Sequence, residues 1–293
     1  MEVGVRILVT NDDGVRAPGI AALARAARAA DHEMVVVAPM IDYSGAGAAV
    51  GPVHARDGID YERWSIDGLE DVPVFAVDAP PALAVILTCV GAFGPPPDVV
   101  LSGINHGANV GRSTMHSGTV GAALTGAHFG TRGLAVSIRW GEGESVPWET
   151  PARLATILLP VVASAPAGTV LNVNAPDVAW ADLRGVRSAR LGRGGSIRSA
   201  VHEGAHHPDA SHVPIPPFDA GTLRLDLTAP WDTPDPDLET DAGLIAADYA
   251  ALTVLVGVRE AGAESAEPVL AASFAALGSA GVDVGAADPA PAP

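Results

Sequence analysis

Two adjacent carboxylates near the start of the chain are the strongest candidates for a chemical role. A short, apolar, β-branched run at 5–10 is followed directly by Asn11, Asp12, Asp13 and Gly14. Neighbouring carboxylates at the end of a buried strand are costly unless a positive charge lies between them. A hard divalent cation would supply that charge. A turn or a helix cap needs only one carboxylate, so the sequence favours a metal site over a purely structural role.

A second candidate site lies where a long loop rich in Gly and Asn meets a helix of small residues. Ser117, Gly118 and Thr119 begin that helix. A helix start with two hydroxyls presents free backbone N–H groups and side-chain donors, which suits an anion. N-capping by Ser117 or Thr119 explains the same residues more simply. The long polar loop just before them favours an anion site, because a packed domain has little other use for it.

An alternation of strands and helices positions both candidate sites. Strands are predicted at 5–10, 33–38, 74–77, 98–102, 134–138 and 169–174, helices at 18–30, 78–90, 117–130 and 150–164, and a small hairpin within 48–73. This spacing indicates βαβ units and therefore an α/β fold with a mostly parallel sheet. Ligands of such sheets bind at the carboxyl ends of the strands, where both candidate sites fall.

The alternation fades in the last third of the chain. Strands are predicted at 184–191, 222–228 and 251–256, a short helix at 244–249, a last helix at 268–277, and a disordered tail at 278–293. The histidines His202, His206, His207 and His212 lie in a polar stretch between the first two strands. Their spacing fits no standard zinc pattern, so we interpret that stretch as a solvated loop.

The composition limits the classes of partner. With 17 basic and 34 acidic residues, the formal net charge of −17 argues against binding a nucleic-acid polymer. The single cysteine, Cys89, excludes a disulfide within the chain and is more plausible as a core residue than as a nucleophile. We expect a cytoplasmic protein, because the start lacks a signal-peptide pattern and no apolar stretch reaches the roughly 18 residues of a membrane span.

Several short motifs occur together in the order and spacing of one known family. They are Asn-Asp-Asp-Gly at 11–14, Ala-Pro-Gly-Ile at 17–20, Val-Ala-Pro at 37–39, Ser-Gly at 44–45, Ser-Gly-Ile-Asn at 102–105 with Gly107 and Asn109, Ser-Gly-Thr at 117–119, Leu-Asn-Val-Asn at 171–174 with Pro176, and Thr-Asp at 240–241 before Tyr249. One block alone would be weak evidence, but together they are specific. The chain thus resembles the SurE survival-protein nucleotidases over roughly residues 5–256.

The resemblance implies a fold and an activity. The fold is a Rossmann-like core at 1–180 with a C-terminal extension at 181–260 that exchanges between subunits, followed by a terminal helix at 261–277 and the tail at 278–293. A homodimer or homotetramer is therefore expected. The activity is metal-dependent hydrolysis of nucleoside 5′-monophosphates, and of 3′-monophosphates as a further option. An alternative is a regulatory protein that binds metal and nucleotide with weak or different phosphatase activity.

The resemblance also implies roles for individual residues. The metal ligands are Asp12, Asp13, Ser44 and Asn105, an all-oxygen set that suits one Mg²⁺ or Mn²⁺ per subunit. The phosphate is surrounded by Asn11, Gly45, Asn109, Ser117, Gly118 and Thr119. Asp12 or Asp13 accepts the proton of an attacking water, and a phospho-aspartate route is the alternative.

The chain departs from the family pattern on the side where base and sugar would bind. Ile41-Asp42-Tyr43 stands where many relatives carry basic residues, and the run after Ser44-Gly45 is apolar. His116 replaces an aromatic residue and is either a proton donor to the leaving group or a packing substitute. A dinucleotide-dependent oxidoreductase is disfavoured, because the first loop lacks Gly-x-Gly-x-x-Gly and holds carboxylates instead.

Overall fold

The structure is a computed structural model. It describes residues 5–28, 32–55, 57–141, 145–192, 198–202, 224–228 and 237–258, with a few residues from 267 to 279. The chain divides into two compact units, 1–257 and 258–293. In the second unit the described residues from 267 to 279 are helical, and they overlap the last helix predicted at 268–277.

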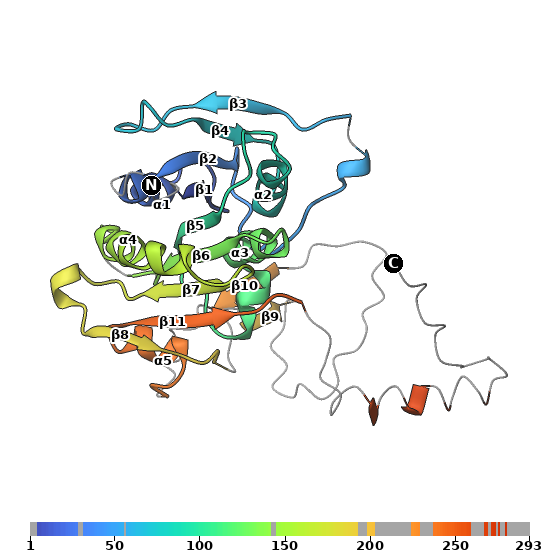
Figure 1. The fold of residues 1–293 in the computed structure, drawn as a ribbon. Coiled ribbons are helices and arrows are strands. Elements are labelled where there is room, and N and C mark those ends of the chain that lie inside the picture. Colours follow the sequence, from blue (N-terminus) through green and yellow to red (C-terminus); the bar gives the residue numbers. More distant parts are fainter. Residues whose placement is uncertain are drawn as a thin grey trace. The chain divides into compact units, whose positions relative to one another are not determined.

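A nine-stranded sheet forms the centre of the first unit (Figure 1). Its order is β3 (Tyr61–Trp64), β4 (Val74–Val77), β2 (Glu33–Pro39), β1 (Arg6–Thr10), β5 (Val99–His106), β6 (Arg132–Ile138), β7 (Val170–Ala175), β11 (Tyr249–Leu255) and β8 (Gly185–Ser188). The six strands from β4 to β7 are parallel, whereas β3 and β11 pair antiparallel with their inner neighbours, and β8 is parallel to β11. The predicted α/β fold with a mostly parallel sheet is confirmed.

Helices cover both faces of the sheet. They are α1 (Pro18–Arg28), α2 (Pro81–Cys89), α3 (Gly118–His128), α4 (Glu149–Ala163) and the short α5 (Asp241–Ala246). Helices α1 and α4 pack together, as do α2 and α3, and Figure 1 shows the two pairs on opposite sides of the strands.

Alternate residues of the central strand supply the core on both faces. Ile7 and Val9 of β1 pack in the cluster that includes α1 and α4, and Leu8 packs in the cluster that includes α2. Successive side chains of a strand point to opposite faces, so a strand covered on both sides is apolar throughout. This double burial is why the first strand could be recognised from its sequence.

One strand is longer than predicted. The sequence favoured a loop after residue 102, but β5 continues to His106 with an irregularity in its pairing to β6 between Gly103 and Asn105. Gly103 has a φ of +133°, and a Cβ there would lie 2.2 Å from the carbonyl oxygen of Val136. Only glycine fits this close approach, so the glycine that suggested a loop is what lets the strand continue.

The C-terminal part of the first unit differs from the prediction in several places. Strand β10 (Arg224–Thr228) pairs antiparallel with β9 (Arg198–His202). The sequence predicts a solvated loop around His202, and this prediction is wrong at His202, because this residue lies in β9. The segment 203–222, with the other three histidines, lies outside the described residues.

Helix α5 begins earlier than predicted because Thr240 caps it, accepting a hydrogen bond from Gly243 N at 3.1 Å. In the described part of the segment 48–73, strand β3 pairs antiparallel with β4, which lies outside the predicted hairpin.

Two further observations concern membrane-spanning helices and the single cysteine. Within the part of the chain that the structure describes, no helix is long and apolar enough to cross a membrane. Cys89 packs beside the cluster that includes α2, and burial raises the pKa of its thiol to about 11. A thiol with that pKa stays protonated near neutral pH, which agrees with a core role.

Candidate active site at the carboxyl edge of the sheet

The turn after β1 holds two carboxylates at the centre of the sheet's carboxyl edge. Asn11 is buried, and its amide donates to the carbonyl of Gly14 at 3.0 Å, which closes the turn. Asp12 is only 3 % exposed, and Asp13 is half-buried. The side-chain oxygen of Asn11 has no hydrogen-bond partner among the described residues.

The start of α3 lies directly against Asp12. The Thr119 hydroxyl donates to Oδ1 of Asp12 at 2.5 Å. A Cβ on Gly118 would lie 2.7 Å from Oδ2 of Asp12, so this position has no room for a side chain. Ser117 caps the helix by accepting from Val120 N at 3.0 Å. The simpler N-cap interpretation of Ser117 is therefore confirmed, while Gly118 and Thr119 join the predicted anion site to the acidic turn.

The environment disfavours two negative charges on the acidic turn. Burial raises the pKa of Asp12, although the hydrogen bond from Thr119 lowers it. Burial, and then the charge of Asp12, raises the pKa of Asp13 to about 7. A bound cation would reverse both effects, because an opposite charge favours the ionised carboxylate.

Two other strand ends meet the acidic turn. The backbone N–H of Tyr43, in the loop after β2, donates to the carbonyl of Asp12 at 2.8 Å, which places Ser44 one residue from that contact. At the end of β5, the backbone N–H of His106 donates to Oδ2 of Asp13 at 3.5 Å. Asn105, the preceding residue, donates its amide N–H to Gly107 at 2.5 Å. The structure thus gathers the segments that carry all four predicted metal ligands.

The remaining predicted residues lie around this edge with different contacts. Gly45 has a φ of +83° and faces open space. The exposed His116 accepts at its carbonyl from the N–H of Gly47 at 3.0 Å, so the loops after β2 and before α3 touch. A Cβ on Gly121 would lie 2.4 Å from the carbonyl oxygen of Gly47, so this contact requires glycine in α3.

Asn109 points into the sheet. Its amide donates to Ser137 Oγ at 2.8 Å, and its backbone N–H donates to Oδ1 of Asn174 at 2.8 Å. Its carbonyl accepts from the amides of Asn172 and Asn174, both at 2.9 Å. These contacts hold the loop 107–111 onto β6 and β7. The role of Asn109 at a phosphate stays a prediction.

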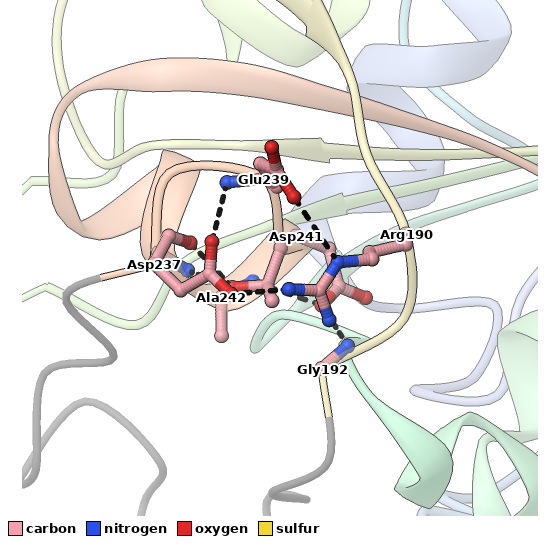
Figure 2. A network of polar contacts seen from close by, with 8 residues as sticks. Arg190, Gly192, Asp237, Glu239, Asp241 and Ala242 are labelled. Atoms are coloured by element: carbon pink, nitrogen blue, oxygen red, sulfur yellow. Dashed lines mark hydrogen bonds and ion pairs between the residues drawn. The ribbon is translucent and has the colours of Figure 1, made fainter.

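Asp241 is a structural anchor of the site that the sequence analysis did not single out as functional. It is fully buried, and its Oδ2 accepts from the N–H of Gly111 at 2.8 Å, in the loop just before Ser117. Its Oδ1 accepts from the N–H groups of Gly192 and Ala242 at 3.0 and 2.9 Å. Figure 2 shows these last two contacts beside Arg190, which forms ion pairs with Asp237 and Glu239. In the sequence, the Thr-Asp pair at the start of α5 is the feature that could have identified this residue.

Replacing Asp241 with asparagine is expected to lower stability by about 1–3 kcal/mol and to raise KM for a phosphomonoester. An amide oxygen can still accept from Gly192 and Ala242, but its NH₂ group then faces the N–H of Gly111 and releases the loop. Thermal unfolding and phosphate-release kinetics measure the two effects. Glu239→Gln is the matched control: its ion pair is exposed, with a 3.6 Å separation, and little change is expected. Equal effects of the two substitutions would contradict the anchoring role.

The contribution of Asp13 to the stability of the metal-free protein is expected to fall as pH rises from about 4 to about 7. The folded-state pKa of Asp13 lies above its ordinary value, so this carboxyl binds more protons in the folded state than in the unfolded state across this window. Thermal unfolding in a chelator at several pH values measures the slope. Asp13→Asn should flatten it, and Mn²⁺ should stabilise the native protein more at pH 8 than at pH 5. An unchanged slope in Asp13→Asn would contradict the assignment.

The fold and the site together define an α/β protein in which two carboxylates and the start of a helix meet at the carboxyl edge of a parallel sheet. The chain belongs to the Survival protein SurE family, whose profile matches residues 7–197.

Individual relatives and one solved structure agree with this family assignment. The chain is 42 % identical over 193 residues to a 5′-nucleotidase SurE of Xanthomonas campestris pv. campestris (strain B100), covering 64 % of this chain and 70 % of that protein. It is 41 % identical over 196 residues to a 5′-nucleotidase SurE of Xylella fastidiosa (strain 9a5c), with the same coverage. The crystal structure of the SurE protein from Aquifex aeolicus superposes with a TM-score of 0.69 at 26 % identity, covering 92 % of this chain and 99 % of that one.

Proposed function

We propose that this protein is a metal-dependent phosphomonoesterase that hydrolyses nucleoside 5′-monophosphates, with 3′-monophosphates as further substrates. The observation that carries the proposal is the Asp12–Asp13 pair, buried against the start of α3 at the carboxyl edge of the sheet. The relatives at about 40 % identity are named 5′-nucleotidases, which supports the same activity.

The donor set fits a hard divalent cation. Among the described residues no group of three or more His, Cys, Asp and Glu side chains is arranged for a metal, so a site here needs neutral oxygens beside the two carboxylates. Ser44 and Asn105 would supply them, because their segments contact Asp12 and Asp13. All-oxygen donors favour Mg²⁺ or Mn²⁺, and we propose one ion per subunit. When bound, the ion supplies positive charge and Lewis acidity next to the phosphoryl group.

The chain's own residues provide binding and proton transfer. Ser117, Gly118 and Thr119 place the positive end of α3 against the phosphate, which offsets charge on its oxygens during the reaction. Asp13 accepts the proton of the attacking water, since its partly exposed carboxylate is reachable while Asp12 is held by Thr119.

A substrate panel tests the proposal. Phosphate release should be measured from nucleoside 5′- and 3′-monophosphates and from small phosphomonoesters, with Mg²⁺, Mn²⁺ and a chelator. We expect release from 5′-monophosphates that the chelator abolishes. Metal-dependent nucleotide binding without hydrolysis would contradict the enzyme and favour the regulatory alternative.

We also expect a homodimer or homotetramer assembled through the extension at 181–260. A mass from light scattering tests this expectation, and a monomer would contradict it.

A further inference from the structure

Trp140 is an exposed aromatic side chain beside the acidic turn. It follows β6 at the carboxyl edge and is 55 % exposed; among the tryptophans in the described part of the chain, it alone is exposed rather than partly buried. Its ring stacks on that of His106, with centroids 4.1 Å apart and an interplanar angle of 7°. The exposed indole ring offers an apolar, aromatic surface to a ligand at this edge of the sheet.

The stack is held in a fixed position relative to the carboxylates. The backbone of His106 contacts Asp13, and its ring meets Trp148 edge-on, with centroids 5.6 Å apart. Trp148 in turn lies against the start of α1, where a Cβ on Gly19 would lie 3.1 Å from its ring. One face of Trp140 is therefore covered by an imidazole that is itself packed, and the exposed part of the ring is available to a partner. A ring ordered in advance binds at a low cost in entropy.

We propose that Trp140 is the stacking surface for the nucleobase of the substrate, an inference that rests on the proposed function. With the phosphate held at Asp12, Asp13 and the start of α3, the ribose and base extend along the carboxyl edge of the sheet. His106 directly links that edge to Trp140. Every base has a π-face, so a stacking surface accepts all of them and favours the larger purines. The chain thus has a means of holding a base that does not depend on the altered loop at 41–50.

The test compares a substrate that has a base with one that lacks it. AMP and ribose 5-phosphate share the phosphate and the sugar, and only AMP can stack. For Trp140→Ala we expect KM for AMP to rise about tenfold with kcat nearly unchanged, and both constants for ribose 5-phosphate to stay at wild-type values. Trp140→Phe, which keeps a ring, should restore most of the affinity for AMP. In the wild type, purine monophosphates should have a lower KM than pyrimidine monophosphates.

Other outcomes would overturn the inference. An unchanged KM for AMP in Trp140→Ala would show that the ring does not contact the base. Equal losses on AMP and ribose 5-phosphate, or a change in assembly size, would show a structural or intersubunit role instead. If the wild-type protein hydrolyses neither compound, the proposed function fails separately. Quenching of tryptophan fluorescence by AMP then decides the stacking: loss of the quench in Trp140→Ala supports it, and a retained quench overturns it.

Discussion

Replacing Asp13 with asparagine is expected to lower kcat for phosphate release roughly 10²–10⁴-fold, the range typical of a lost general base. The substitution keeps the shape of the side chain and removes both its charge and its ability to accept the proton. Steady-state phosphate release from AMP with saturating Mn²⁺ measures the loss.

The same substitution should make the metal-free protein more stable at pH 8. Burial raises the pKa of Asp13 to about 7, so its ionised form destabilises the folded state there, and a neutral amide removes this penalty. A variant that is less active and more stable cannot owe its defect to misfolding. Asp42→Asn is the matched control, because an amide oxygen can still accept from Ser44 N as Oδ1 of Asp42 does at 2.7 Å. Full activity in Asp13→Asn would contradict the assigned role.

Replacing Gly118 with alanine is expected to abolish most activity and to lower stability by about 1–3 kcal/mol. The new methyl group would lie 2.6 Å from Cβ and 2.7 Å from Oδ2 of Asp12, so either the carboxylate or the start of α3 must move. Either movement separates the acidic turn from the helix start that we propose binds phosphate. Phosphate-release kinetics and thermal unfolding measure the two losses.

Gly58→Ala is the control for this prediction. Gly58 has no atom within 4 Å of an added Cβ and needs no left-handed backbone, so little change is expected. A fully active Gly118→Ala protein would show that the close approach of α3 to Asp12 is not required.

The parts of the fold that could be predicted from sequence are those whose burial leaves a simple pattern. Strands β1 and β2 are apolar on both faces because helices cover both sides of the sheet. The end of β5 was missed because Gly103 and the polar residues after it look like a loop, although the neighbouring backbone of Val136 requires that glycine. Strand β9 was missed because its sequence is polar and resembles the stretch around it.

Only the residues of the candidate site that belong to short sequence motifs could be predicted. The carboxylates and the Ser-Gly-Thr start of α3 stand out in sequence, and the structure brings them into contact. The anchoring role of Asp241 does not stand out in the sequence, because its partner is distant in the chain: Asp241 accepts from the N–H of Gly111, 130 positions away. The pairing of His106 with Trp140 depends on β5 and β6 being neighbours, which the chain order alone does not establish.

Titration of the metal-free protein with Mn²⁺ in a calorimeter tests whether Asp12 and Asp13 form a cation site. We expect one ion bound per chain, with protons released below about pH 7 because the pKa of Asp13 is raised in the absence of metal. We also expect Asp12→Asn and Asp13→Asn each to remove most of the binding. Retained binding with wild-type affinity in both variants would contradict this assignment.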